Sequence, residues 1–147
     1  MHPAVAFAPA PDHPGWQEWV IGPEGQFNRH TFARILSRLD DPATARIRIF
    51  PDERHANFND VIHGGVILAF IDMAVYPASI LITGNEDLKV VTVDVHTQFI
   101  SPGDLAMPLD ALVTLTKETG RMLFTRGTLV QQETVVAAFT MLQRKVR

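Results

Sequence analysis

The chain has 147 residues, of which 46% are hydrophobic and 20% charged, with a formal net charge of −3. This length and composition are typical of one soluble globular domain and argue against a disordered or fibrous chain. The lack of a basic surplus excludes nucleic acid as an expected partner, and the absence of cysteine excludes disulfides, a thiolate nucleophile and Cys-ligated metals. A cysteine-free chain fits a reducing compartment, so we expect a cytoplasmic protein.

The first 44 residues are the least regular part of the sequence. Met1–Gly15 contains four prolines and no basic residue near its start, so it lacks the features of a secretory signal and is interpreted as a mobile arm. Between Gln26 and Leu39 the apolar residues recur at helical spacing, which predicts a short helix. We therefore expect an N-terminal arm over residues 1–44 and a single compact domain over residues 45–147.

One long apolar segment dominates the middle of the chain. The run from Gly64 to Ile82 predicts a central helix that is buried nearly all round. Pro77 predicts a kink or an early break near residues 73–76, because proline removes a backbone donor. The segment is also long enough to cross a bilayer, but Asp72 and Pro77 favour a core helix, and we expect no membrane contact.

Strand patterns flank this helix. Ala45–Phe50 alternates arginine with isoleucine, and Lys89–Ile100 alternates apolar and polar residues, so that the odd-numbered side chains are expected to pack on the helix. Three further strands, expected to pair as an antiparallel meander, are predicted near Pro108–Thr116, Met122–Gln131 and Thr134–Leu142. The order indicates an α+β domain in which one sheet wraps one helix.

The start of the central helix and its single carboxylate are the candidate chemical groups. Gly64 and Gly65 leave backbone N–H groups at a helix N-terminus without side chains in the way, which favours an oxyanion site, although such a pair also eases helix–sheet packing. Asp72 is the one formally charged residue of the helix, and burying a carboxylate is costly enough to indicate function. The alternative for Asp72 is a structural cap or an ion pair with an arginine.

The spacing of these groups has a consequence for assembly. Gly64 and Asp72 are eight residues apart, or about 12 Å along a helix, so one subunit cannot bring both to the same substrate atom. If both act on one substrate, Asp72 meets the Gly64 end of a second copy. The catalytic interpretation therefore predicts an antiparallel homodimer with two composite sites.

Two polar residues precede the glycine pair. Asn57 lies in a loop, where its amide can hold a carbonyl or a water, but it is equally an ordinary turn residue. His63 is a candidate ligand, a base or a residue that starts the helix. The histidines show no metal-ligand spacing, so no metal site is expected.

At these residues the sequence resembles the hotdog-fold thioesterase superfamily, in particular the phenylacetate-degradation, PaaI-like type of acyl-CoA thioesterase. Asn57, His63-Gly64-Gly65 and Asp72 have the spacing of that family's motif, and the segment from Thr92 to Gly103 resembles the strand that follows its helix. The resemblance extends from about Ala45 to Leu142. It implies a hotdog fold, with an antiparallel sheet around a long central helix.

The resemblance also implies roles for individual residues. Asp72 would be the general base or nucleophile towards the thioester carbonyl, and the Gly64 N–H the oxyanion donor. Asn57 and His63 would position the carbonyl or the attacking water. Thr92 would orient that water, although it lies on the polar face, expected to point away from the core, and is otherwise a simple strand former.

The partners implied are coenzyme A, as part of an acyl-CoA substrate with an aromatic or a short to medium acyl group, and a second copy in a homodimer that pairs into a dimer of dimers. Gly65 and Arg121 would contact CoA, although an arginine in a hairpin turn is often merely solvated. No other cofactor is expected.

The sequence departs from the family pattern at two places, and other functions compete with hydrolysis. Asp60 stands where relatives usually have glycine, although it can still adopt the left-handed conformation, and Pro77 interrupts the helix. Both changes lie near the expected acyl pocket. The main alternative is a non-catalytic protein that binds or senses acyl-CoA, and a hydratase on the same fold is a third class.

Overall fold

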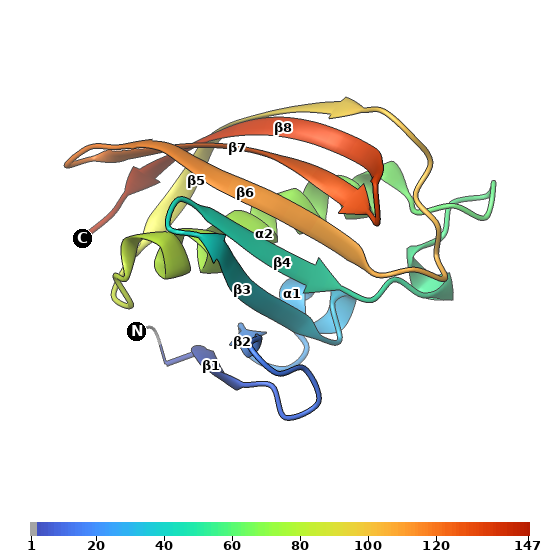
Figure 1. The fold of residues 1–147 in the computed structure, drawn as a ribbon, viewed down its shortest axis with the longest axis horizontal. Coiled ribbons are helices and arrows are strands. Elements are labelled where there is room, and N and C mark those ends of the chain that lie inside the picture. The colour runs from blue at the N-terminus through green and yellow to red at the C-terminus, as the bar shows by residue number, and fades with distance from the viewer. Residues whose placement is uncertain (1–2) are drawn as a thin grey trace.

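The computed structural model describes residues 3–147, which form one eight-stranded antiparallel sheet curved around a long helix (Figure 1). The strand order across the sheet is β1-β2-β3-β4-β6-β7-β8-β5. This confirms the predicted α+β class with one sheet wrapped around one helix. In chain order the elements are β1 (Val5–Pro9), β2 (Gln17–Ile21), α1 (Phe27–Thr31), β3 (Ile35–Asp41), β4 (Thr44–Ile49), the 3-10 turn η1 (Glu53–His55), α2 (Gly64–Thr83), β5 (Val90–Phe99), β6 (Leu109–Glu118), β7 (Met122–Gln131) and β8 (Thr134–Lys145).

The central helix α2 forms as predicted, because its apolar residues fill the inside of the curved sheet. It begins at Gly64 and ends before Gly84, whose φ of 69° is the left-handed conformation that commonly terminates a helix. The helix continues through Pro77, so the expected break is absent. Pro77 is buried in the core, where tertiary packing of the apolar helix offsets the lost backbone hydrogen bond.

Burial of α2 is less complete than its sequence predicts. Gly65, Leu68 and Asp72 are exposed, and they lie three to four residues apart, so they form one stripe along the helix. By length and composition α2 is also able to cross a membrane, and 56% of that stretch is buried inside the domain. The stripe is the part of the helix that the sheet of a single chain leaves uncovered.

The residues before β4 differ most from expectation. The predicted helix over 26–39 is wrong beyond α1, because residues 35–41 form β3, which pairs with both β2 and β4. Residues of the expected mobile arm form β1, which pairs with β2. The sheet thus continues across residue 45, where we expected the compact domain to begin.

A second apolar cluster explains why β3 has a helix-like pattern. Ile35 packs in the main core, while Leu36 packs with Ala10 and Trp16 on the outer face of the sheet. The guanidinium groups of Arg38 and Arg48 also lie over the Trp16 ring, each 4.7 Å from the ring centroid. Because both faces of the strand are covered, consecutive residues are apolar and the alternation typical of a strand is lost.

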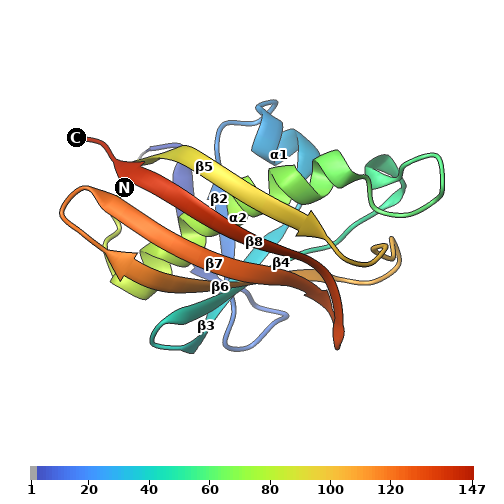
Figure 2. The ribbon, with the colours of Figure 1, turned by 90° about the horizontal axis from the view of Figure 1, so that it is seen from above.

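The last strand of the sheet, β5, has only one neighbour, β8, and its other edge is free (Figure 2). The meander of β6, β7 and β8 confirms the three predicted strands. The expected burial of the apolar face of β5 does not occur in the single chain. Exposed apolar residues on and beside this strand are Val91, Val93, Val95, Phe99 and Ile100.

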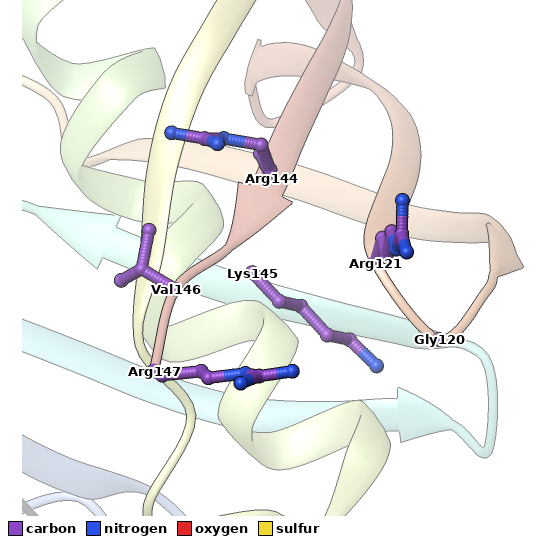
Figure 3. A pocket seen from close by; sticks show the side chains of 6 residues that line it. All are labelled: Gly120, Arg121, Arg144, Lys145, Val146 and Arg147. Carbon is purple, nitrogen blue, oxygen red and sulfur yellow. The ribbon is translucent and has the colours of Figure 1, made fainter.

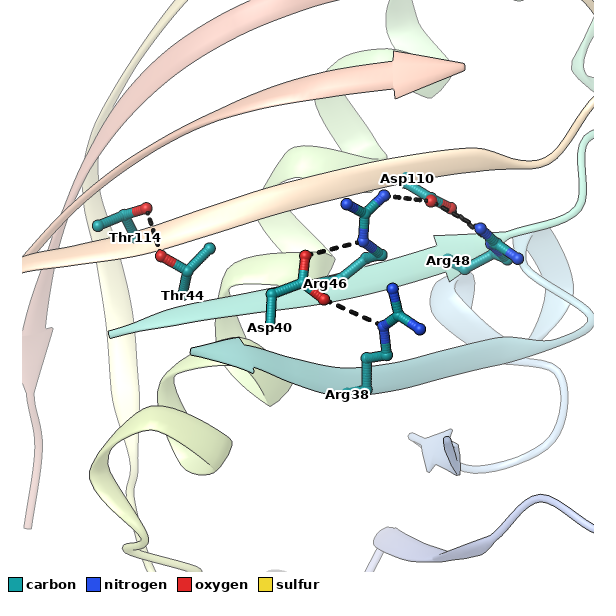
Figure 4. A network of polar contacts seen from close by, with 7 residues as sticks. All are labelled: Arg38, Asp40, Thr44, Arg46, Arg48, Asp110 and Thr114. Carbon is teal, nitrogen blue, oxygen red and sulfur yellow. Dashed lines mark hydrogen bonds and ion pairs between the residues drawn. The ribbon is translucent and has the colours of Figure 1, made fainter. Parts of the chain in front are cut away.

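Charged side chains join β3, β4 and β6 on the outer face of the sheet (Figure 4). Asp110 is 5% exposed and accepts hydrogen bonds from Arg46 at 2.9 Å and from Arg48 at 2.7 and 2.8 Å. The hydrogen bonds that Arg48 donates to Asp110 raise the pKa of the Arg48 guanidinium. Asp40 links Arg46 to Arg38 with two bonds of 3.0 Å. This network fixes the strands that support α2 from behind.

Replacing Asp110 tests how much this network contributes to the stability of the fold. We expect Asp110→Asn to lower the free energy of unfolding by about 2–3 kcal/mol, because it leaves two partly buried arginines without their shared carboxylate. Asp40→Asn is the matched control and should cost about 0.5 kcal/mol, since its ion pairs are more exposed. Urea unfolding measures both, and equal losses would contradict the proposed difference.

Candidate active site

A short hydrogen bond ties the edge strand to the central helix. The Thr92 hydroxyl donates to Asp72 Oδ1 at 2.7 Å. The sequence placed Thr92 on the polar face of the strand, away from the helix, and this placement is wrong. The pairing register shifts between Thr92 and Asp94, so Val93 is an extra residue in β5. Such a bulge exchanges the two faces of a strand.

The bulge determines which side chains of β5 face the helix. Beyond it, Val95, Thr97 and Phe99 pair with Met141, Phe139 and Ala137, all of which are buried on the helix side. Before the bulge, Thr92 pairs with the buried Gln143, which also faces inward. Thr92, Val95 and Phe99 therefore share the inner face, and the exposed stripe of α2 lies beside them.

A groove runs between this stripe and β5. The apolar residues that line it were not predicted as part of the site, although the alternation of apolar and polar residues along β5 already places them on one face of the strand. The Asp72 carboxylate lies in this groove, exposed in the single chain rather than buried as expected. The groove holds about 570 Å³ and is lined by Leu68, Asp72, Val95, His96, Thr97 and Phe99.

The two glycines at the start of α2 have different roles. The Gly65 N–H donates to His63 Nδ1 at 2.8 Å, so His63 caps the helix and the Gly65 N–H is already used. The Gly64 N–H has no acceptor among residues 3–147. Of the expected oxyanion donors, Gly64 alone therefore presents an unpaired N–H at the positive end of the helix.

The His63 ring is oriented by the same bond. Because Nδ1 accepts from Gly65, the proton of a neutral ring lies on Nε2, which leaves that N–H as a donor on the exposed side. A β-carbon on Gly65 would come within 3.0 Å of His63 Nδ1, so a glycine here accommodates the cap. What Gly65 supplies to the site is space for the imidazole.

The Asn57 amide shapes the loop before the helix. Asn57 Oδ1 accepts the N–H groups of Asn59 at 2.8 Å and Val61 at 3.3 Å, so Nδ2 is the part of the amide left for a substrate or water. Asp60 has a φ of 58°, which confirms that it adopts the left-handed conformation expected of it. The turn thus survives without glycine.

The two halves of the site lie in neighbouring pockets: Asp72 lines the groove beside β5, Gly64 lines a second pocket of about 300 Å³, and Phe99 lines both. Asp72 is bonded to Thr92, whereas a β-carbon on Gly64 would lie 3.4 Å from the Phe99 ring. Thr92 and Phe99 are separated by most of the length of β5. A single chain therefore keeps the carboxylate and the unpaired N–H apart, as their spacing along α2 predicts.

Tyr76, one turn after Asp72, fixes the start of β5. Its hydroxyl donates to the backbone carbonyl of Leu88 at 3.3 Å. Burial raises the pKa of the Tyr76 hydroxyl, so it stays protonated and remains a donor. This bond holds the chain that leads into Thr92 against the helix.

Four basic residues gather at the Thr92 end of the sheet (Figure 3). They line a pocket of about 800 Å³ between the β6–β7 hairpin and the end of β8, formed by Gly120, Arg121, Arg144, Lys145, Val146 and Arg147. Lys145 is paired with Glu118, whereas the guanidinium groups of Arg121 and Arg144 have no acidic partner within residues 3–147. Arg144 lies next to Gln143, the residue that pairs with Thr92.

No metal site accompanies these groups in the part of the chain that the structure describes, where no three histidine, aspartate or glutamate side chains are arranged to hold an ion. The arrangement offers a carboxylate, a helix-start N–H, a histidine donor and an apolar groove. These groups suit acid–base or nucleophilic attack on a polarised carbonyl.

A known protein family and several solved structures are similar to this chain. The family model of the thioesterase superfamily matches residues 59–138, from the loop before α2 into β8. No curated protein sequence matches the chain.

Solved structures share the fold at low sequence identity. Zebrafish thioesterase superfamily member 2 has a TM-score of 0.71 at 16% identity, with 82% of this chain and 87% of that chain covered. The E. coli PaaI protein from the phenylacetic acid degradation operon has a TM-score of 0.61 at 18% identity, covering 71% and 73%. A hypothetical thioesterase from Streptococcus pneumoniae, crystallised with coenzyme A, has a TM-score of 0.66 at 15% identity, covering 80% and 90%. The fold is therefore the hotdog fold.

The helix cap gives a test that is independent of any activity. His63→Ala removes the acceptor for the Gly65 N–H, and we expect the free energy of unfolding to fall by about 1 kcal/mol. His63→Asn should recover most of that loss, because asparagine is a good N-cap. Urea unfolding at one protein concentration measures the series, and an alanine variant as stable as the original chain would contradict the cap.

Proposed function

The chain belongs to the thioesterase superfamily, and we propose that it hydrolyses an acyl-CoA thioester to the free acid and CoA, at a site shared by two subunits. The observation that carries the proposal is the 2.7 Å bond from Thr92 to Asp72. It holds one carboxylate in an apolar groove with its second oxygen, Oδ2, available for chemistry.

In this mechanism Asp72 activates the attacking oxygen. As a general base, Asp72 takes a proton from a water molecule whose oxygen attacks the thioester carbon, and the proton then passes to the departing sulfur of CoA. Thr92 orients the carboxylate and the water. In the alternative route, Oδ2 attacks the carbonyl carbon itself, the C–S bond breaks and CoA leaves as its thiolate, and water then hydrolyses the resulting anhydride to the free acid and restores the Asp72 carboxylate. Both routes need the carboxylate in its ionised form.

Hydrogen-bond donors at the start of α2 stabilise the negative charge that develops on the carbonyl oxygen. The Gly64 N–H points at the oxyanion that develops when the thioester carbon becomes tetrahedral. The His63 Nε2–H and the Asn57 amide Nδ2 are further donors that position the carbonyl or the water. The unpaired state of the Gly64 N–H supports this assignment, since an N–H already bonded within the chain has nothing to offer a substrate.

The free edge of β5 supports the shared site. An exposed apolar edge strand favours pairing with another strand. Two copies of β5, antiparallel about an axis near Val95 and His96, place Thr92 of one copy opposite Phe99 of the other. Because Thr92 holds Asp72 and Phe99 lies by Gly64, this pairing brings the carboxylate of one subunit to the helix start of its partner.

We expect the two pockets to hold different parts of the substrate. The groove between Leu68 and Phe99 is mostly apolar, which suits an aromatic or a short to medium acyl group. The basic pocket around Arg121 lies at the Thr92 end, where it can pair with the phosphates of CoA. A dimer of dimers and a cytoplasmic location stay predictions.

Release of free thiol from acyl-CoA tests the chemistry directly. We expect Asp72→Asn to lower kcat roughly 10²- to 10⁴-fold, because the amide cannot accept a proton. Thr92→Val should lower kcat about tenfold through loss of a bond to a charged group, while Thr92→Ser keeps the hydroxyl and most of the activity.

The control for these variants is Asp94→Asn, an exposed carboxylate on the outer face of the same strand. It should leave kcat unchanged. Equal rates for Asp72→Asn and the original chain would overturn the role of Asp72, and tight CoA binding without turnover in the original chain would favour a binding or sensing protein.

Mixing two variants that are damaged in different halves of the site tests whether the site is shared. Asp72→Asn damages one half of each site and His63→Ala the other, so a mixed dimer contains one intact and one doubly damaged site. After unfolding and refolding together at equal amounts, half of the dimers are mixed, and about a quarter of the original activity should return. A site within one subunit would give no recovery.

A further inference from the structure

One buried histidine has no part in the proposed mechanism. His55, the last residue of η1, is 4% exposed, and both nitrogens of its ring have partners. Nδ1 accepts the Asp52 N–H at 3.0 Å, and Nε2 lies 2.7 Å from the carbonyl oxygen of Thr31. A neutral ring with its proton on Nε2 satisfies both contacts, since it accepts at one nitrogen and donates at the other. His55 therefore links two segments of the chain and has no free nitrogen for a substrate or a water.

The main chain of His55 holds the start of α2. Its carbonyl oxygen accepts the His63 N–H at 2.8 Å, and an isolated β-bridge between Ala56 and Ile62 continues this pairing. The loop that these contacts close projects from the domain (Figures 1 and 2). Since Gly64 directly follows His63, a shift of His55 also moves the unpaired Gly64 N–H.

The same loop carries the three donors that we assign to the substrate carbonyl. Asn57 lies at one side of its base, two residues after His55, and His63 and Gly64 lie at the other side. Within the loop, Asn57 N donates to the Val61 carbonyl at 2.8 Å. A loop ordered in this way moves as a unit, so the position of its base decides where all three donors lie.

Aromatic packing fixes the His55 ring against α2. The ring stacks on Phe32, with 6.3 Å between the centroids and 19° between the planes. Phe32 in turn packs beside Phe70 of α2, with 6.0 Å between the centroids, and both phenyl rings are buried. Phe70 lies two residues before Asp72. The base of the loop is thus tied to the helix that carries the carboxylate.

We propose that His55 is a positioning residue for the oxyanion half of the site, because its ring fixes the base of the loop that carries the three donors. This proposal rests on the proposed function. His55 does not touch the substrate and acts through the donors, which stabilise the transition state only when they are placed accurately. The groove and the basic pocket are built by other elements. Loss of the ring contacts is therefore expected to lower kcat and to leave KM for the acyl-CoA unchanged.

Three substitutions of His55 separate its two ring contacts. His55→Ala removes both, and we expect kcat to fall about 10- to 100-fold, because displaced donors no longer meet the developing charge. KM should stay unchanged. His55→Gln keeps an N–H for the Thr31 carbonyl, and His55→Asn keeps an acceptor for the Asp52 N–H, so each should retain more activity than His55→Ala. Release of free thiol from acyl-CoA measures the series.

The matched control is Asp110→Asn, which also removes hydrogen bonds of a buried side chain, but on the outer face of the sheet. It should leave kcat unchanged at a temperature where both variants are folded. A fall in kcat for His55→Ala no larger than that for Asp110→Asn would overturn the inference. Glutamine and asparagine variants no more active than His55→Ala would also overturn it.

Double variants locate the effect within the site. The losses from His55→Ala and Thr92→Val should multiply, because the two residues serve different halves of the site. Combined with His63→Ala, His55→Ala should cost less than its own factor, because both alter the same donors. Full multiplication with His63→Ala would contradict a role through the donors.

Failure of the original chain to hydrolyse acyl-CoA would count against the proposed function, and amide hydrogen exchange followed by NMR would then decide the inference. The His63 N–H, which is bonded to the His55 carbonyl, should exchange at least about tenfold faster in His55→Ala. The Ile71 N–H, in the middle of α2, should exchange at its original rate. Unchanged exchange at His63, or an equal rise at both amides, would overturn the inference.

Discussion

A single sheet of eight strands cannot enclose a twenty-residue apolar helix on every side, and this constraint organises the molecule. The sheet covers the greater part of α2 and leaves one stripe, from Gly65 through Leu68 to Asp72, beside the free edge of β5. The uncovered surface is therefore the place where a ligand or a second copy can reach the helix. The carboxylate is on that surface, and so are the apolar residues that an edge strand normally hides.

One inserted residue then decides which groups meet in the groove. Without the bulge at Val93, Thr92 would share a face with Asp94 and His96 and point away from α2. With it, the Thr92 hydroxyl reaches Asp72, and Val95 and Phe99 still line the groove. A bulge locally disrupts the hydrogen-bond pairing between strands, and here the hydrogen bond from Thr92 to the charged Asp72 offsets that loss.

The N-terminal residues show how tertiary contacts alter local preference. Ile35 and Leu36 are consecutive apolar residues because β3 is covered on both faces, by the core on the inside and by Trp16 on the outside. The same pattern on an isolated segment is that of a helix. The covering loop is itself held by the Arg38 and Arg48 side chains, so the outer face of the sheet is a second, smaller packing layer.

By itself, the sequence determined the long helix with its glycine start, the strands that follow it, the distance between Gly64 and Asp72, and the motif residues of the candidate site. These depend on local periodicity, on helix geometry and on short spacings, all of which can be read along the chain. Only the tertiary structure decided which face of β5 Thr92 occupies. It also decided that the Gly65 N–H donates to His63 while the Gly64 N–H stays unpaired, and that the residues before β4 extend the sheet. Those outcomes depend on strand pairing and on competition for hydrogen bonds between distant residues, which no local pattern encodes.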